Sequence, residues 1–405
     1  MKLIFVNRYF HPDISATSQM LSSLAFHLAA AGCEVHVVTS RQRYDDPMAG
    51  FAPSEVVSGV HVHRVRTSRF GRPNLRGRAL DYLTFYFAAT FTLLMITRRA
   101  DVIVAKTDPP LISVPAAIVA RLRGARLVNW LQDLFPELAE HLGVRIGRVA
   151  GLARIARNYS LRNADFNVVV GEQMRRKVES LQREARVRVI HNWADGTMIV
   201  PVDKGASAMR ETWGLAGKFV VAYSGNLGRA HEFDTILEAA TLLRDDSRIV
   251  FLVIGGGYRV GGLATGAQVR GLSNVIFRAY QPPKNLCASL GAADLHLITL
   301  LPSLEGLLVP SKVYGILAAG RPALNVGDPA GEVAAILADA QAGMTIPTGD
   351  ATLLAKTIVQ LASSPERTAE LGMNARRSFD QRYSQHVAFE RWSQLLREAG
   401  LNVAH

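Results

Sequence analysis

Two stretches of this chain have the same order of elements: a short apolar run, a polar loop and then a helix. The first combines the apolar run 2–6, the loop 7–13 and apolar residues at helical spacing from 20 to 29. The second combines the apolar run 219–223, the loop 224–229 and a helical segment, 234–243. Units of this kind open doubly wound parallel sheets, which bind ligands beyond the carboxyl ends of their strands. The sequence therefore predicts an α/β fold with two Rossmann-like domains.

The length of 405 residues supports two domains, because it is long for one hydrophobic core. Further apolar runs at 34–39, 101–105, 125–130 and 166–170 are expected strands of the first domain. A stretch rich in Gly, Ala, Ser and charge around 196–216 is the expected linker. The apolar runs 249–254, 275–277 and 323–326 are expected strands of the second domain.

Residues 302–324 carry the most specific chemistry in the sequence. Glu305 and Gly306 open a loop after a predicted strand, and Ser311 is expected to cap a helix that ends at Gly320. A helix N-terminus attracts phosphate, whereas a neighbouring carboxylate accepts hydrogen bonds from sugar hydroxyls. This pairing predicts a site for a sugar that is joined to a diphosphate.

The same residues carry a resemblance to a known family. Glu305-Gly306-Leu307-Leu308 and Ile316-Leu317-Ala318-Ala319-Gly320-Arg321-Pro322 resemble the donor-site loop and helix of retaining glycosyltransferases of family 4, which have the GT-B fold. The family has a second Glu at the helix start that usually holds the nucleotide ribose, but Val313 and Gly315 stand at the two positions that alignment gives for it. Lys312 is expected to take over part of the donor contact. The Pro-Ser-Lys-Val-Tyr sequence resembles the branch that builds colanic acid, capsule and O-antigen repeat units.

The resemblance implies where each substrate binds. Glycines let the backbone approach a diphosphate, and Arg229 has the charge to neutralise it, although a plain surface arginine is the alternative. Glu305 is the expected catalytic carboxylate, and the aromatic Tyr280 is a candidate for stacking on the base. The expected donor-binding residues are Gly225, Asn226, Gly228, Arg229, Gly255, Gly257, Tyr280, Gly306, Leu307, Leu308, Ser311 and Lys312.

In the first domain, residues 132–137 resemble the Asp-Leu-Trp-Pro-Glu loop of the same branch. Asp133 in this loop is the second expected catalytic residue, as an acceptor contact or general base; a carboxylate that caps a helix is the alternative. Tyr9, His11 and Asp108 are expected on the acceptor side.

The resemblance also implies the architecture and the reaction. An acceptor-binding domain (1–197) and a donor-binding domain (198–380) are expected to face a central cleft, with a C-terminal helix (381–405) that crosses back to the first domain. The reaction is transfer of a sugar, with retention, from a nucleotide-sugar, UDP- before GDP-, to a lipid-linked or saccharide acceptor in cell-surface polysaccharide biosynthesis. We expect no metal and no cofactor, because helix ends and basic residues offset the diphosphate charge.

The net charge of +12 favours anionic partners, and residues 64–99 concentrate this charge beside an apolar helix. Six arginines lie in 64–78, and the apolar run 79–97 is closed by Arg98 and Arg99. Three alternatives remain for 79–97: a buried helix packed on the sheet, an interfacial helix on anionic lipid, or a transmembrane span. Cys33 and Cys287 are expected to be buried thiols in a reducing cytoplasm. The expected location is the inner face of the cytoplasmic membrane.

Three other functions compete with this one. A sugar-nucleotide epimerase shares the architecture but needs no acceptor. The basic charge also suits a nucleic-acid-binding protein, but no nucleic-acid module is recognisable, so no nucleic-acid partner is expected. The missing second Glu fits a donor-binding subunit with impaired catalysis.

Overall fold

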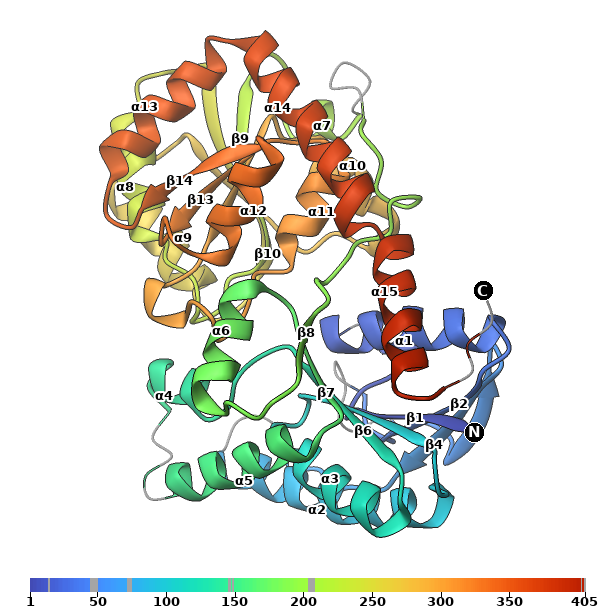
Figure 1. Cartoon of the computed structure of the whole chain (residues 1–405). Coiled ribbons are helices and arrows are strands. Elements are labelled where there is room, and N and C mark those ends of the chain that lie inside the picture. The colour runs from blue at the N-terminus through green and yellow to red at the C-terminus, as the bar shows by residue number, and fades with distance from the viewer. Residues whose placement is uncertain are drawn as a thin grey trace. The chain divides into compact units, whose positions relative to one another are not determined.

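The chain forms two compact α/β units in a computed structural model (Figure 1). The structure describes all residues except 14, 44–49, 71–74, 145–146, 148, 203–207, 402 and 404–405. Unit 1 comprises Met1–His191 and Phe389–His405, and unit 2 comprises Asn192–Ala388.

Unit 1 is built on an eight-stranded sheet in the order β3-β4-β2-β1-β5-β6-β7-β8. Every neighbouring pair is parallel except β3 and β4, which are antiparallel and were not anticipated from the sequence. The order places the carboxyl ends of β1, β5 and β6 side by side. The strands are β1 Lys2–Val6, β2 Glu34–Ser40, β3 Ser54–Val57, β4 Val60–Val65, β5 Val102–Lys106, β6 Arg126–Leu131, β7 Phe166–Val169 and β8 Val187–Val189.

The longer helices of unit 1 pack on this sheet through buried side chains. Ser15 caps the first of them, because its side chain accepts a hydrogen bond from the backbone N–H of Ser18. The last helix, α15, begins in unit 2, and its residues from Phe389 onward belong to unit 1. The helices are α1 Ala16–Ala30, α2 Leu75–Ile96, α3 Ser113–Arg123, α4 Glu137–His141, α5 Val149–Asn163, α6 Glu172–Leu181 and α15 Gln385–Glu398.

The long helix α2 is neither fully buried nor fully exposed. Phe85, Ala89 and Leu93, four residues apart, lie in the core of unit 1 and are 0% exposed. The apolar stretch Gly77–Ile96 is long and apolar enough to cross a membrane. However, only 22% of it is buried inside the protein. Of the three alternatives for 79–97, a helix packed on the sheet describes one stripe of α2, whereas most of its apolar surface is not buried.

Unit 2 has an all-parallel sheet of six strands in the order β11-β10-β9-β12-β13-β14. The strands β9 and β10 are longer than predicted, so that Ser224, Gly225 and Asn226 end a strand rather than forming a loop, and so do Gly255 and Gly256. The strands are β9 Phe219–Asn226, β10 Ile249–Gly256, β11 Val275–Arg278, β12 Leu295–Thr299, β13 Ala323–Gly327 and β14 Gly343–Pro347.

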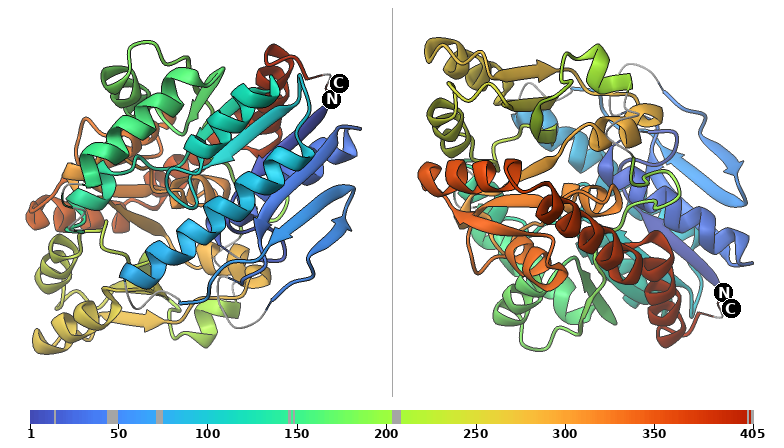
Figure 2. Two further views of the ribbon diagram at one scale, coloured as in Figure 1. Left: turned by 90° about the horizontal axis from the view of Figure 1, so that it is seen from below. Right: turned by 90° about the horizontal axis from the view of Figure 1, so that it is seen from above.

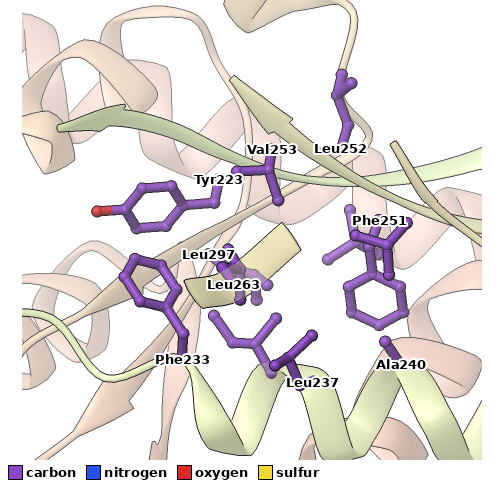
Figure 3. Close-up of a pocket in the computed structure, with 12 residues that line it drawn as sticks. Tyr223, Phe233, Leu237, Ala240, Phe251, Leu252, Val253, Leu263 and Leu297 are labelled. Carbon is purple, nitrogen blue, oxygen red and sulfur yellow. The ribbon is translucent and has the colours of Figure 1, made fainter. Parts of the chain in front are cut away.

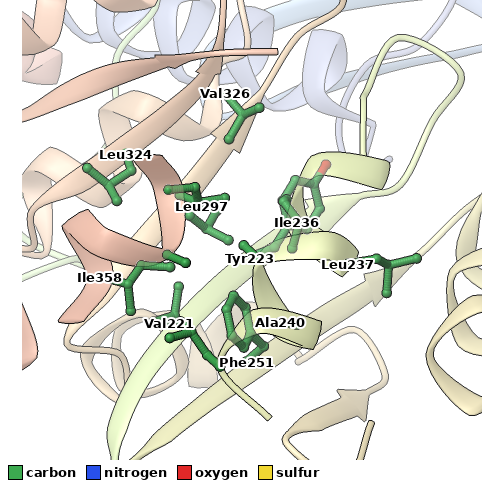
Figure 4. Packing of buried hydrophobic residues seen from close by; sticks show 14 of the residues in the cluster. Val221, Tyr223, Ile236, Leu237, Ala240, Phe251, Leu297, Leu324, Val326 and Ile358 are labelled. Carbon is green, nitrogen blue, oxygen red and sulfur yellow. The ribbon is translucent and has the colours of Figure 1, made fainter. Parts of the chain in front are cut away.

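The core of unit 2 lies between this sheet and helices such as α8 and α13. Figure 4 shows Val221, Phe251 and Leu297 from the sheet against Ile236 and Ile358 from the helices. The elements are α7 Ala208–Thr212, α8 Asp234–Leu242, α9 Val260–Val269, η2 Pro283–Asn285, α10 Leu286–Gly291, η3 Pro302–Leu304, α11 Lys312–Ala318, α12 Glu332–Ala340, α13 Ala351–Ala362, α14 Pro365–Ser378 and η4 Phe379–Tyr383.

Both cysteines are free thiols, as expected, but they are partly exposed rather than buried.

Candidate functional site

Glu305 lies in the loop that leaves the central strand β12, where its carboxylate meets the start of α12. One carboxylate oxygen, Oε2, accepts a hydrogen bond of 3.1 Å from the backbone N–H of Glu332. The backbone of Gly331 lies so close that a Cβ there would be 2.3 Å from the other oxygen, Oε1. Oε1 is itself buried and has no hydrogen-bond partner among the described residues. Glu305 thus has one oxygen anchored and one available.

Burial raises the pKa of the Glu305 carboxyl to about 7, because a charged carboxylate loses its hydration there. The nearby carboxylates of Asp328 and Glu332 raise this pKa further, whereas the hydrogen bond from the Glu332 backbone lowers it. The half-buried carboxyl group is therefore poised between its two protonation states near neutral pH.

Lys312, seven residues after Glu305, points its ammonium group into the carboxyl end of the sheet. Its Nζ lies 3.6 Å from the centroid of the Tyr223 ring and equally close to the position that a Cβ on Gly225 would occupy. Nζ is buried and has no hydrogen-bond partner among the described residues. Burial holds the pKa of this ammonium well below its usual value. Such a buried amino group favours the binding of an anion, because a bound anion would stabilise the charged form of Lys312.

His231 completes this cluster as a neutral side chain. Its Nδ1 donates a hydrogen bond of 2.7 Å to the carbonyl oxygen of Thr299, which leaves Nε2 as an acceptor. Burial lowers the pKa of His231 to about 3, and the neighbouring Lys312 contributes to this shift. The ring also lies edge-on to Tyr223, with centroids 5.8 Å apart. His231 therefore orders the site without adding positive charge.

Two glycines at and after the end of β10 lie where a Cβ would collide with the end of β9. Gly255 has a φ of +143°, and a Cβ on it would lie 2.0 Å from the carbonyl oxygen of Gly225. A Cβ on Gly257, with a φ of +132°, would lie 2.3 Å from the side-chain oxygen of Asn226. Bare backbone therefore lines this edge of the sheet, as close approach of a ligand requires.

The remaining predicted donor residues surround this edge. Tyr280 is 56% exposed, and its ring lies against Gly256, where a Cβ would be 3.1 Å away. Arg229 is exposed, and its guanidinium stacks over the Tyr258 ring at 4.2 Å. Gly228 follows β9, and Gly306 is buried with a φ of +73°. Leu307 is buried, whereas Leu308 is half-buried.

One feature of the predicted helix start is wrong. Ser311 precedes α11, as expected, but its backbone is already helical and its side chain makes no capping hydrogen bond. The helix that follows has only seven residues. Its end was predicted correctly, because Gly320 adopts a left-handed φ of +63° after Ala318. The positive charge that α11 brings to the site is therefore that of the Lys312 side chain.

Unit 1 brings Asp108 and Asp133 together at the carboxyl ends of β5 and β6. Burial, and then the charge of Asp108, raise the pKa of Asp133 to about 7. Asp133 is not a helix cap, because Pro136 holds the N-cap position of α4 and no side chain bonds there. The hydroxyl of Thr17 reaches a carboxylate oxygen of Asp108 at 3.5 Å. This edge of unit 1 thus holds two neighbouring carboxylates.

Lys106 directly follows the predicted strand 101–105 and is the last residue of β5, with 1% exposure. Its Nζ lies 3.5 Å from the Trp130 ring centroid and has no hydrogen-bond partner among the described residues. Tyr9 is also buried, at 7% exposure, with the Arg8 guanidinium over its ring. His11 is exposed, and its carbonyl oxygen accepts a hydrogen bond from Arg64.

A small apolar pocket lies beneath the donor edge but has a different character. Figure 3 shows Tyr223, Phe233, Leu237 and Leu263 around it, and apart from the Tyr223 hydroxyl its lining is hydrocarbon. That hydroxyl donates a hydrogen bond of 2.9 Å to the carbonyl oxygen of Asn226. The pocket is a packing gap of the core, and a sugar would find no partners in it.

Sequence reasoning missed Tyr223, Gly331 and Lys106 as parts of these sites. Tyr223 carried a usable signal, since it is an aromatic residue at the end of a buried strand just before a glycine. Gly331 and Lys106 carried none, because their positions depend on contacts between distant segments. Within the described part of the chain, no group of three or more His, Cys, Asp or Glu side chains is arranged to hold a metal ion.

Solved structures show which fold this chain has. The chain superposes on sucrose-phosphate synthase from Thermosynechococcus elongatus with a TM-score of 0.77 and 18% identity, covering 98% of this chain and 99% of that one. It superposes on Anabaena Alr3699/HepE, solved in complex with UDP and glucose, with a TM-score of 0.74 and 17% identity, again covering 98% and 99%. The fold is that of the GT-B glycosyltransferases, as predicted.

Comparison with family models assigns the chain more narrowly. Residues 16–193 match the glycosyl transferase 4-like domain, and residues 207–378 match the glycosyl transferases group 1 domain. The chain belongs to the glycosyltransferases that combine these two domains, which confirms the resemblance stated above.

Two curated relatives share this organisation. The chain is 27% identical over 352 residues to "Probable glycosyltransferase WbjE" of Pseudomonas aeruginosa, covering 86% of this chain and 87% of the relative. It is also 27% identical over 337 residues to "Putative colanic acid biosynthesis glycosyl transferase WcaI" of Escherichia coli K12, covering 80% and 83%.

Proposed function

We propose that this protein transfers a sugar from a nucleotide-sugar to a lipid-linked or saccharide acceptor in cell-surface polysaccharide biosynthesis. The observation that carries the proposal is the buried ammonium of Lys312 at the carboxyl end of the unit 2 sheet. It lies beside bare backbone and has no hydrogen-bond partner among the described residues. A diphosphate would supply the missing partner. The relative WcaI, which is named for colanic acid biosynthesis, supports a role in polysaccharide biosynthesis. The complexes of HepE with UDP-glucose and with UDP and glucose support UDP-sugars as the first donors to test.

In the proposed reaction, the donor diphosphate lies against Gly225 to Gly228, Arg229 and Lys312, and Tyr280 stacks on the base. Glu305 holds hydroxyls of the transferred sugar through its free oxygen, and its charge stabilises the ring as it becomes cationic. The acceptor hydroxyl attacks from the face that the diphosphate leaves, so the anomeric configuration is retained. A diphosphate oxygen helps to take the hydroxyl proton. Lys312 and Arg229 offset the negative charge of the diphosphate, and the proposed reaction uses no metal and no cofactor.

In unit 1, Asp133 and Asp108 would accept hydrogen bonds from the acceptor sugar. We further propose that the basic, apolar segment 64–99 holds the protein peripherally at the inner face of the cytoplasmic membrane. Arg72 in this segment lies outside the described residues, as does the side chain of Arg76.

Screening for donor binding followed by product analysis tests the proposal. A panel of UDP-, GDP- and dTDP-sugars should contain at least one that raises the unfolding temperature, since a bound donor stabilises the fold. With lipid-linked acceptors, the same donor should then give a glycosylated product whose anomeric configuration matches that of the donor. An epimerised nucleotide-sugar formed without acceptor would favour the epimerase instead. Donor binding with no turnover of any kind would favour an impaired donor-binding subunit.

Substituting alanine for Gly331 should lower turnover about tenfold, because a Cβ would push the Glu305 carboxylate from its anchored position. Steady-state kinetics would measure the change. Gly331 has a φ of −76°, so alanine itself is not strained there. Gly262→Ala is the matched control, because a Cβ at Gly262 meets nothing within 4 Å and turnover should be unchanged. Equal rates for both variants would contradict the role given to this contact.

Turnover should fall as the pH decreases below about 7. Both Glu305 and Asp133 have pKa values raised to about 7, and both must be ionised in the proposed mechanism. Below that pH each group binds a proton, so kcat/KM should fall by between about tenfold and a hundredfold for each pH unit. A pH–rate profile, with unfolding temperatures recorded at each pH, would measure this fall. A flat profile from pH 5.5 to 8 would contradict the expectation that turnover depends on deprotonation of these two carboxyl groups near pH 7.

A further inference from the structure

Three helices cover the same face of the unit 1 sheet and lie side by side. The middle one, α3, packs against both α2 and α5, as Figures 1 and 2 show from different directions. Their inner sides contact one hydrophobic core, which includes Phe85 from α2 and Ala116 from α3, and Tyr159 from α5 packs against it. The outer sides of the three helices therefore form one continuous layer that faces away from the sheet. We call it the outer helix face of unit 1.

This outer helix face carries many large apolar side chains exposed to solvent. On α2 they follow one another at intervals of three or four residues, which places them in a single stripe. Their exposure ranges from 43% for Leu80 to 76% for Phe87. The exposed apolar residues are Leu80, Leu83, Phe87, Phe91, Met95, Ile118, Leu122, Val149, Leu152 and Ile155. Contiguous patches of this kind mark interaction surfaces in stable proteins.

The charge on the same face has one sign. The three helices, of 22, 11 and 15 residues, contain one acidic residue, Asp81, which is 1% exposed and accepts hydrogen bonds from Ser68 and Phe70. The positive charges are arginines. Those that are exposed on these helices or directly after α2 are Arg98, Arg99, Arg121, Arg123 and Arg162.

We propose that the outer helix face of unit 1 is the surface on which the protein lies on an anionic lipid bilayer, with α2, α3 and α5 parallel to the membrane plane. Apolar side chains would enter the boundary between headgroups and acyl chains, and the arginines would meet lipid phosphates. The inference deepens the membrane contact proposed above and rests on it. It differs from that proposal in the surface that contacts the membrane, because α3 and α5 lie outside residues 64–99.

The packing of α2 argues against the other arrangements. A transmembrane α2 would have to withdraw Phe85, Ala89 and Leu93 from the core of unit 1, and would leave the buried Asp81 without its partners. A second copy docked through the same face would set arginines opposite arginines, with no exposed acid on these helices to pair them. An anionic lipid surface satisfies both the apolar side chains and the charge.

Vesicle cosedimentation of the full chain tests the proposal with two sets of substitutions. One set is Phe87→Ser with Phe91→Ser on α2, and the other is Leu122→Ser with Leu152→Ser on α3 and α5. Each set should weaken binding to vesicles of phosphatidylcholine and phosphatidylglycerol about tenfold or more. The unfolding temperature should stay near that of the wild type, because all four side chains are exposed. Binding to the mixed vesicles should also weaken at high salt, and pure phosphatidylcholine should bind less protein.

Val269→Ser with Met373→Ser is the control, since both residues are exposed, at 80% and 63%, and lie in unit 2. Its binding should match the wild type. Unchanged binding of the α3 and α5 variant would overturn the proposal, as would a dimer in light scattering that either set of substitutions dissociates. Donor-induced thermal shifts measured on the same variants keep the two proposals apart, because they should persist whether or not the vesicles bind.

Discussion

Glu305→Gln should lower turnover about a hundredfold while donor affinity changes little. Glutamine keeps the size of the side chain and an oxygen that can accept the hydrogen bond from the Glu332 backbone. It removes the negative charge, which the proposed mechanism needs most when the sugar ring is cationic. Loss of one preorganised electrostatic contact of this kind typically reduces kcat by about 10²–10³-fold. Parallel measurements of kcat and of donor binding by calorimetry would separate the two effects.

The substitution should not disturb the fold, because burial already favours the uncharged form of Glu305. A carboxyl whose pKa is raised on folding costs stability when it ionises, so stability falls between its unfolded and folded pKa values as the pH rises. The glutamine variant lacks this penalty and should unfold at a temperature equal to or above that of the wild type at pH 8. Glu238→Gln, an exposed glutamate of the same unit, is the control for a lost charge. Turnover at the wild-type rate in Glu305→Gln would refute its catalytic role.

Lys312→Met should weaken nucleotide binding about tenfold to a hundredfold and at the same time stabilise the empty protein. The lysine holds an ammonium in a buried position with no hydrogen-bond partner among the described residues. Its contact with the Tyr223 ring offsets only part of the lost hydration. Methionine keeps the apolar stem and removes the charge, so the free energy of unfolding should rise by about 1 kcal/mol. In this variant, a bound diphosphate would lack the positive charge of Lys312.

The two effects have opposite signs, which makes the experiment discriminating. Denaturant unfolding would measure the empty protein, and the donor-induced thermal shift would measure binding. Lys356→Met on α13 is the control, because Lys356 is exposed and both quantities should remain unchanged. A variant that is stabilised but still binds donor as the wild type does would show that Lys312 is a structural residue.

The sequence predicted those parts of the fold that depend on local pattern. Apolar runs located β1, β9 and β12, and the glycine that ends α11 was identified because few other residues adopt its left-handed backbone. The loop at Glu305 was found through its resemblance to a family motif. Each of these features can be recognised within a window of about ten residues.

Contacts between distant segments were not predictable in the same way. Nothing near residue 312 indicates that its ammonium rests on Tyr223, which lies 89 positions earlier. Gly331 approaches Glu305 only because β12 and β13 are neighbours in the sheet. The expected cap at Ser311 failed for a related reason, since the backbone there is already helical before the residue can cap it. Likewise, hydrophobicity alone could not tell which sides of α2, α3 and α5 pack on the sheet.

Gly255 has a consequence for anyone who maps this protein by random mutagenesis. A Cβ there would sit 2.0 Å from the carbonyl oxygen of Gly225, so every replacement forces the neighbouring strands β9 and β10 apart. In a screen scored by activity alone, position 255 would be as intolerant as a residue that touches the sugar, although it contributes no functional group. Only a parallel score for protein abundance separates these two causes of inactivity.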